Sequence, residues 1–256
     1  MEPTSGRAVA LSMAVMSGCG SAHGSEELET AKPEVGVVEG VVRLDASSEL
    51  PAYARLGDDN QPEPPRQCSP AKKTDLRPVS LSESRGLGGM IVGATGFSEG
   101  PPVPRRVHEV TLRDCRLEPR VIAATRGDAV RMTNLTDYPF LPQFGRGQLM
   151  QTLLKDETRD IPLAASGVLR LGCGFAAPCG SVDVAVFNHG LHAVTDTEGR
   201  FRIEGVPANE DVEIHVWHPL FDKAVQKVRL KKGEVKRLEF TARPPKKTDE
   251  PQTVLR

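Results

Sequence analysis

Two cysteines and two histidines near the middle of the chain are the residues whose types and spacing could do chemistry. Cys173 and Cys179 lie in the segment LRLGCGFAAPCGSVDVAVFNHGLHAVTD (169–196), and His189 and His192 follow the apolar run after them. Thiolate and imidazole groups together are typical ligands of copper or zinc, whereas two cysteines in an oxidising compartment form a disulfide. The segment therefore predicts either a metal site or a disulfide, and the compartment bears on the choice.

The beginning of the chain predicts export. A single basic residue, Arg7, precedes a short apolar run that ends at Met16, and small residues then lead to Cys19. Such a run is typical of a secretory signal, because a membrane-spanning helix needs about 20 apolar residues. The MSGC ending resembles the cleavage site of bacterial lipoproteins. This resemblance implies a signal peptide over 1–19, a lipid anchor at Cys19 and a flexible tether over 20–34; the alternative is a plain cleaved signal.

Composition and motifs argue against several other classes of function. The chain has 256 residues, a net charge of −1 and dispersed basic residues, which predicts no nucleic-acid surface. It contains no HExxH, CxxC or phosphate-binding glycine-rich loop, and we expect no enzymatic activity. Asp183 and Asp196 are isolated carboxylates, expected to be solvated or to form a hairpin turn. The proline-rich, polar residues 244–256 predict a disordered tail.

The elements that must hold these residues are predicted to be strands. VGVVEGVVRLD (35–45) alternates between apolar and polar residues, and the runs SVDVAVF, GRFRIEGVP and VEIHVWHP follow later in the chain. Turns separate these later runs at the spacing of about 8–12 residues that is typical of a sandwich. No stretch shows a sustained helical stripe. The predicted class is all-β.

Two segments then resemble known families. CRLEPRVIAATRGDAVRMTNLTD (115–137) and CGFAAPCGSVDVAVF (173–187) are similar to bacterial cupredoxin-like proteins of the plastocyanin and methylamine-utilisation type. TDTEGRFRIEGVP (195–207) is similar to carboxypeptidase regulatory-like sandwiches. The resemblance implies a cupredoxin-like Greek-key β-sandwich over 35–183, merged with or followed by a carboxypeptidase regulatory-like (transthyretin-like) β-sandwich segment over 184–243.

The copper ligands that this resemblance would imply are largely absent. Cupredoxin-like proteins of this type hold copper with one cysteine, two histidines and one methionine. Cys173 matches the ligand cysteine, but Ala176 and Cys179 stand where the second histidine and the methionine would be. The first histidine is missing as well, since no histidine lies between His108 and His189. A thiolate without imidazole partners does not favour a blue-copper site, so we expect no cofactor.

The remaining cysteines can instead form disulfides. Setting Cys19 aside leaves four cysteines, and an even number in an exported protein allows two disulfides with three possible connectivities. We expect Cys173–Cys179, which would close the former ligand loop, together with Cys68–Cys115; the other pairings stay open.

The favoured hypothesis is a non-catalytic binding or structural module of the cell envelope. It would be a lipoprotein facing the periplasm or the cell surface, with an unknown protein partner and no affinity for nucleic acid. The alternative is a periplasmic copper-binding or electron-transfer protein with an atypical site made of Cys173, Cys179, His189, His192 and His218.

Overall fold

The structure is a computed structural model, and it confirms the predicted all-β class. It describes residues 34–51, 66, 77–98, 100, 103–145, 148–149, 151–173 and 179–245. These residues form strands and turns and contain no helix, so no helix among them could cross a membrane. The predicted signal peptide, Cys19, the tether up to residue 33, Cys68 and residues 246–256 lie outside the described residues.

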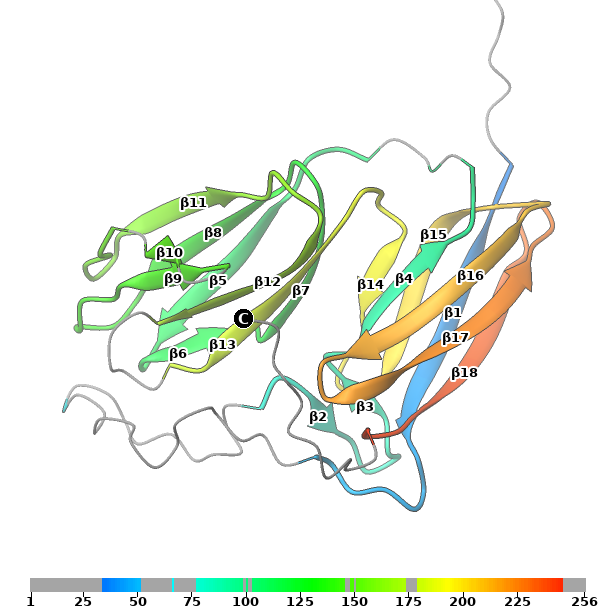
Figure 1. The fold of residues 1–256 in the computed structure, drawn as a ribbon, viewed down its shortest axis with the longest axis horizontal. Helices are drawn as coiled ribbons and strands as arrows, with labels where there is room; N and C mark the ends of the chain where they lie inside the picture. Colours follow the sequence, from blue (N-terminus) through cyan, green and yellow to red (C-terminus); the bar gives the residue numbers. More distant parts are fainter. Residues whose placement is uncertain are drawn as a thin grey trace, which may run out of the picture. The chain divides into compact units, whose positions relative to one another are not determined.

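One sandwich, here called the host sandwich, is built from strands at both ends of the described chain (Figure 1). Its three-stranded sheet has the order β15 (Arg200–Pro207), β1 (Val35–Leu44), β18 (Val235–Ala242). Its second sheet, here called the covered sheet, has the order β14 (His192–Val194), β4 (Ile91–Thr95), β16 (Asp211–His218), β17 (Phe221–Arg229). A small hairpin pairs β2 (Ser80–Leu81) with β3 (Leu87–Gly88).

β1 is the central strand of its sheet, and alternation decides which of its side chains are buried. Val38 and Val42 are fully buried and belong to the host core, while Glu39 and Arg43 point to the opposite face. β1 pairs with β15 antiparallel and with β18 parallel, so both of its edges are hydrogen-bonded. Gly40 is required on the inward side, because a Cβ there would lie 2.8 Å from the ring of Phe201.

The second sandwich, here called the inserted sandwich, is formed by the contiguous strands β5 to β13 (Figure 1). Its five-stranded sheet has the order β10 (Gln148–Leu149), β9 (Pro142–Phe144), β12 (Gly167–Cys173), β13 (Ser181–Phe187), β7 (Val121–Thr125). Its other sheet has the order β11 (Thr158–Pro162), β8 (Ala129–Asn134), β5 (Val107–Arg113), β6 (Arg116–Glu118). It has a core of its own, which includes Val130, Leu171 and Val184.

The predicted boundaries of 35–183 and 184–243 are therefore wrong. Strands β1 to β4 belong to the host sandwich and not to the cupredoxin-like part, and the predicted boundary falls inside β13. The inserted sandwich occupies the chain between β4 and β14. The physical reason is the parallel pairing of β1 with β18, which joins Val37 to Val235 and leaves no trace in the local periodicity of either strand.

Candidate functional site

The cysteine loop is closed by a disulfide, as predicted. Cys173 ends β12 and Cys179 lies fully buried just before β13. The two are disulfide-bonded, with their Cα atoms 6.2 Å apart, inside the usual range for a disulfide. Residues 174–178 between them, including Ala176, lie outside the described residues.

Cys115 is also disulfide-bonded. It sits in the tight turn between β5 and β6, where Asp114 and Cys115 both have positive φ angles, of 48° and 57°. Paired positive φ angles suit a two-residue hairpin turn between twisted antiparallel strands. Its expected partner, Cys68, lies outside the described residues, so the Cys68–Cys115 pairing stays a prediction.

The loop that precedes β9 is held by one buried amide. Asn134 is fully buried, and its Nδ2 donates to the carbonyl oxygens of Tyr138 at 2.9 Å and Leu153 at 3.0 Å. Its Oδ1 accepts hydrogen bonds from the backbone and the hydroxyl of Thr136. This loop leads into β9, where Pro142 is the residue paired with Cys173. The position beside the cysteine is thus occupied by a proline ring and not by an imidazole.

Two of the three histidines of the alternative metal site, His189 and His192, lie far from the cysteines. Cys179 comes just before β13, whereas His189 and His192 come after it. A strand of seven residues spans about 20 Å at about 3.3 Å per residue, so these groups lie at opposite ends of β13. Among the described residues, no group of three or more His, Cys, Asp or Glu side chains is arranged to hold a metal ion.

His192 instead connects the two sandwiches. Its Nε2 lies 2.9 Å from Oγ1 of Thr125, which belongs to β7 of the inserted sandwich. Its ring stacks on Phe187 with the centroids 4.9 Å apart. Burial, reinforced by the charge of His189, lowers the pKa of His192 to about 4. The imidazole is therefore neutral near neutral pH and suits a buried contact.

His218 makes a second connection, to a carboxylate of β13. Its Nδ1 accepts a hydrogen bond from the backbone N–H of Leu220 at 3.2 Å, so its Nε2 carries the proton and lies 3.7 Å from Oδ2 of Asp183. Arg170 of β12 donates to Oδ1 of the same carboxylate at 3.2 Å. The side chains of His218 and Asp183 are only 1% and 4% exposed, so the expectation of a solvated Asp183 was wrong.

Burial sets the protonation of this pair. It lowers the pKa of His218 to about 4, and the positive charge of Arg170 acts in the same direction. It raises the pKa of Asp183, while the charge and hydrogen bond of Arg170 work to lower it. Near neutral pH, His218 is thus a neutral imidazole, and its Nε2 faces Asp183 across the junction at a distance longer than a hydrogen bond.

An apolar patch lies among these polar contacts. Alternation along β13 places Val184 in the inserted core and Ala185 on the opposite face, where it forms a buried cluster with Ile91 of β4 and Val121 of β7. The ring of Phe187 packs directly against Gly93, where a Cβ would meet the ring edge. In sequence, β4 (IVGAT) and β7 (VIAAT) are apolar on both faces, but local periodicity does not tell which element covers the second face.

Comparisons with known proteins found solved structures that are similar to part of the chain. No family model and no curated protein matches it. Among similar solved structures is a purple cupredoxin from Nitrosopumilus maritimus, which is 17% identical, covers 31% of this chain and 99% of its own, and has a TM-score of 0.29. An amicyanin mutant with Cu(I) is 19% identical, with 37% and 99% covered and a TM-score of 0.30. A copper-containing nitrite reductase from Thermus scotoductus is 16% identical, with 36% and 24% covered and a TM-score of 0.28.

Proposed function

We propose that this protein is a non-catalytic binding or structural module of the cell envelope, built on a cupredoxin-like scaffold that has lost its copper site. The observation that carries the proposal is the disulfide between Cys173 and Cys179. Copper binds a thiolate, and both sulfurs of this loop are used in a disulfide.

The residues around Cys173 do not fit a type 1 copper ion. Such an ion needs a thiolate and two imidazoles in one plane, with a weak axial ligand. Here the neighbours of Cys173 are Pro142 on β9 and its disulfide partner Cys179. The imidazole of His192 contacts Thr125 of the other sandwich at 2.9 Å, and that of His218 accepts a backbone hydrogen bond at Nδ1 while its Nε2 faces Asp183.

Export and lipid anchoring are the second part of the proposal. The MSGC sequence before Cys19 supports a lipoprotein signal, and disulfide-bonded Cys115, Cys173 and Cys179 are typical of a protein that leaves the cytoplasm. We further infer that the host sandwich is carboxypeptidase regulatory-like. Its TDTEGRF segment forms a tight turn in which Oδ1 of Asp196 accepts hydrogen bonds from the backbones of Glu198 and Arg200.

A copper titration tests the loss of the metal site. The full chain, oxidised and then reduced, is titrated with Cu(I) and Cu(II) and followed by visible absorption and metal analysis. We expect no stoichiometric copper and no thiolate-to-copper band in the oxidised protein, with the double variant Cys173→Ser, Cys179→Ser as a control for adventitious binding, because it leaves no free thiol in this loop. A stoichiometric blue species that disappears in this double variant would overturn the proposal in favour of an electron-transfer role.

Membrane fractionation tests the anchor. A Cys19→Ala variant should move from the membrane to the soluble fraction or stay unprocessed, because the modified thiol would be missing. The same variant retained on membranes after processing would contradict lipid attachment at Cys19.

A further inference from the structure

The outer face of the three-stranded sheet carries a groove of about 410 Å³. Gly40 and Val41 of β1 line its floor, and residues of β15 and β18 line its sides. Pockets that bind small molecules have volumes of about 300–1,000 Å³, so the groove has room for a small ligand. It lies on the host sandwich, away from the cysteine loop of the inserted one.

Strand register places opposite charges on the two sides of this groove. Val41 is paired with Arg200 of β15 on one side and with Glu239 of β18 on the other. Neighbouring strands lie about 4.8 Å apart, so the backbones of these two residues are separated by about 10 Å. A guanidinium and a carboxylate thus flank an apolar floor.

Arg200 and Glu239 differ from the other charged residues of this face in that neither side chain has a partner among the described residues. Farther along the same face, Arg202 and Arg237 both bind Glu39, each at 2.8 Å, which neutralises that end of the sheet. By contrast, within the described ranges no hydrogen bond or ion pair engages the side chain of Arg200 or Glu239. Both remain available to a ligand.

Arg43 adds a second cation next to Arg200. It lies two residues after Val41 on β1, so Arg43 and Arg200 are diagonal neighbours, about 7–8 Å apart in such a sheet. Its Nη1 donates to the carbonyl oxygen of Ser84 at 2.7 Å, which orients the guanidinium at the end of the groove.

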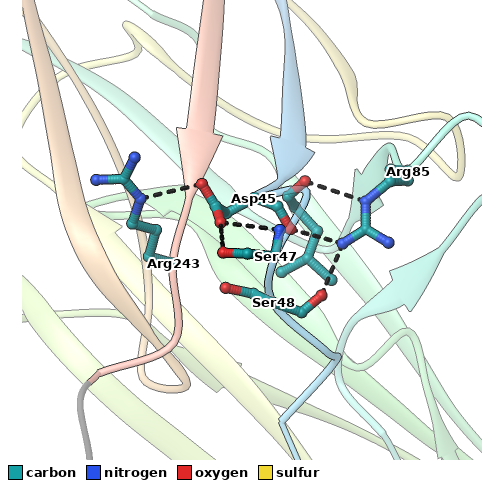
Figure 2. A network of polar contacts seen from close by, with 6 residues as sticks. Asp45, Ser47, Ser48, Arg85 and Arg243 are labelled. Carbon is teal, nitrogen blue, oxygen red and sulfur yellow. Dashed lines mark hydrogen bonds and ion pairs between the residues drawn. The ribbon is translucent and has the colours of Figure 1, made fainter.

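Figure 2 shows how the turn that carries Ser84 is held in place. Arg85, the next residue, donates to the carbonyl oxygens of Asp45 at 2.6 Å and Ser48 at 2.7 Å, beyond the end of β1. Asp45 in turn accepts hydrogen bonds from Ser47 and from Arg243, which follows β18. The end of the groove is therefore fixed by contacts from three segments of the chain.

A second turn completes this end. The Oγ of Ser84 donates to Oε2 of Glu198 at 3.4 Å. Gly86 packs so closely on the backbone of Glu198 that it has no room for a Cβ. The walls are thus ordered before any ligand arrives, which lowers the entropic cost of binding.

We propose that this groove binds a small zwitterion with a carboxylate and an ammonium or amide N–H, the chemistry of an amino acid or a short peptide. The carboxylate would lie between Arg43 and Arg200, the nitrogen donor would face Glu239, and an apolar part would cover Val41. Charge-assisted hydrogen bonds from guanidinium groups suit this carboxylate well. A dianion such as phosphate is disfavoured, since Glu39, Glu198 and Glu239 line the same groove. This inference rests on the proposed binding role and names its ligand class.

Titration of the full chain with tri-alanine, monitored by amide NMR, tests the site. We expect shifts concentrated at Val41, Arg200 and Glu239. Capping the peptide carboxylate as an amide should weaken binding by at least about tenfold, which equals about 1.4 kcal/mol. Acetylation of its amino group should weaken binding less. No shifts at millimolar peptide, equal affinity for the carboxylate-capped form, or tighter binding of inorganic phosphate would each overturn the inference.

Arg200→Gln provides the matched variant, because the side chain of Arg200 makes no hydrogen bond or ion pair with any residue that the structure describes. It should reduce tri-alanine affinity by about tenfold at unchanged Tm. Arg229→Gln, which removes an exposed arginine paired with Asp211 outside the groove, should bind like the parent. Equal affinity in Arg200→Gln and the parent would contradict the site. The copper titration is a separate measurement. An absence of peptide binding at the groove can therefore be distinguished from a failure of the proposed function.

Discussion

The host sandwich has two outer faces that differ in what they contact. The covered sheet presents Ile91, Gly93 and Val194 toward the inserted sandwich, and polar groups at this junction are engaged across it. The three-stranded sheet presents Arg200 and Glu239, which are exposed and unused by the described chain. In both sheets every second side chain points outward. The faces differ because the outward residues are apolar on the covered sheet and charged on the three-stranded sheet. The covered face supports stability, and the open face is suited to recognition.

The largest expected effect is a loss of stability on acidification. The pKa of both His192 and His218 is about 4 in the folded chain, compared with the ordinary value of 6.5. Between these pH values the two histidines are protonated in the unfolded chain but not in the folded chain. The free energy of unfolding therefore falls as the pH is lowered from about 6.5 toward 4. One pKa unit is worth about 1.4 kcal/mol, so the two histidines together cost a few kcal/mol. Denaturant unfolding across this range measures the loss.

Other groups at the junction modify this pH profile in known directions. Burial also lowers the pKa of His189 and His215, which adds to the effect. Asp183 has a raised pKa and acts oppositely, because the folded chain then holds a proton that the unfolded chain releases. His192→Gln keeps a donor for Thr125 without titrating, so its profile should be flatter. A parent stability that does not change over this range would contradict the buried junction.

Filling the closest contact of the covered face should have the next largest effect. In Gly93→Val, the new side chain would collide with the ring of Phe187, which itself stacks on His192. Overpacking of this kind costs about 1–3 kcal/mol, measured as a lower free energy of unfolding. Gly233→Ala is a control outside the junction, where a Cβ meets nothing within 4 Å, although its φ of +72° carries a small cost of its own. Equal losses in the two variants would mean that the junction is not closely packed.

Removal of the disulfide should have a smaller effect, confined to the inserted sandwich. Cys173→Ser with Cys179→Ser opens a loop of six residues in sequence separation, for which the chain-entropy model gives about 2 kcal/mol. The loss should appear as a lower unfolding midpoint. Because the groove lies on the other sandwich, tri-alanine affinity should not change. A parallel loss of peptide binding would show that the two sandwiches are coupled more strongly than their contacts indicate.

Local features of the fold were predictable from the sequence, whereas its connectivity was not. The runs at 35–45 and SVDVAVF correspond to β1 and β13, since alternation is a property of neighbouring residues. The pairing of β1 with β18 and the insertion of a whole sandwich between β4 and β14 depend on contacts far apart in sequence. The Cys173–Cys179 disulfide was predictable because its two residues are only six positions apart in the sequence.

The same distinction holds for the candidate site residues: those with partners nearby in the sequence were predictable, and those with distant partners were not. Asp183 was expected to be solvated, because a single charged residue in an apolar strand does not reveal what lies over its second face. Arg170 comes from the neighbouring strand β12, but the contact with His218 requires the second sandwich. Asp196 was predictable as a turn residue, since its partners Glu198 and Arg200 are its near neighbours. The groove was not predictable, because it depends on the register of three strands that are far apart in the sequence.

The smallest expected effect concerns the open face and separates binding from stability there. Glu39→Gln removes the carboxylate that Arg202 and Arg237 share; Arg202 keeps its ion pair with Glu204, and the guanidinium of Arg237 is left beside the groove. Because exposed ion pairs contribute little to folding, the Tm should change little. Tri-alanine should bind about twofold to fivefold tighter, the range expected for an exposed charge interaction. Calorimetric titration and thermal unfolding of the same sample measure both quantities. A lower Tm with unchanged tri-alanine affinity would contradict a binding role for these charges. It would mean that the charges of this face stabilise the fold, as the polar groups of the covered face do.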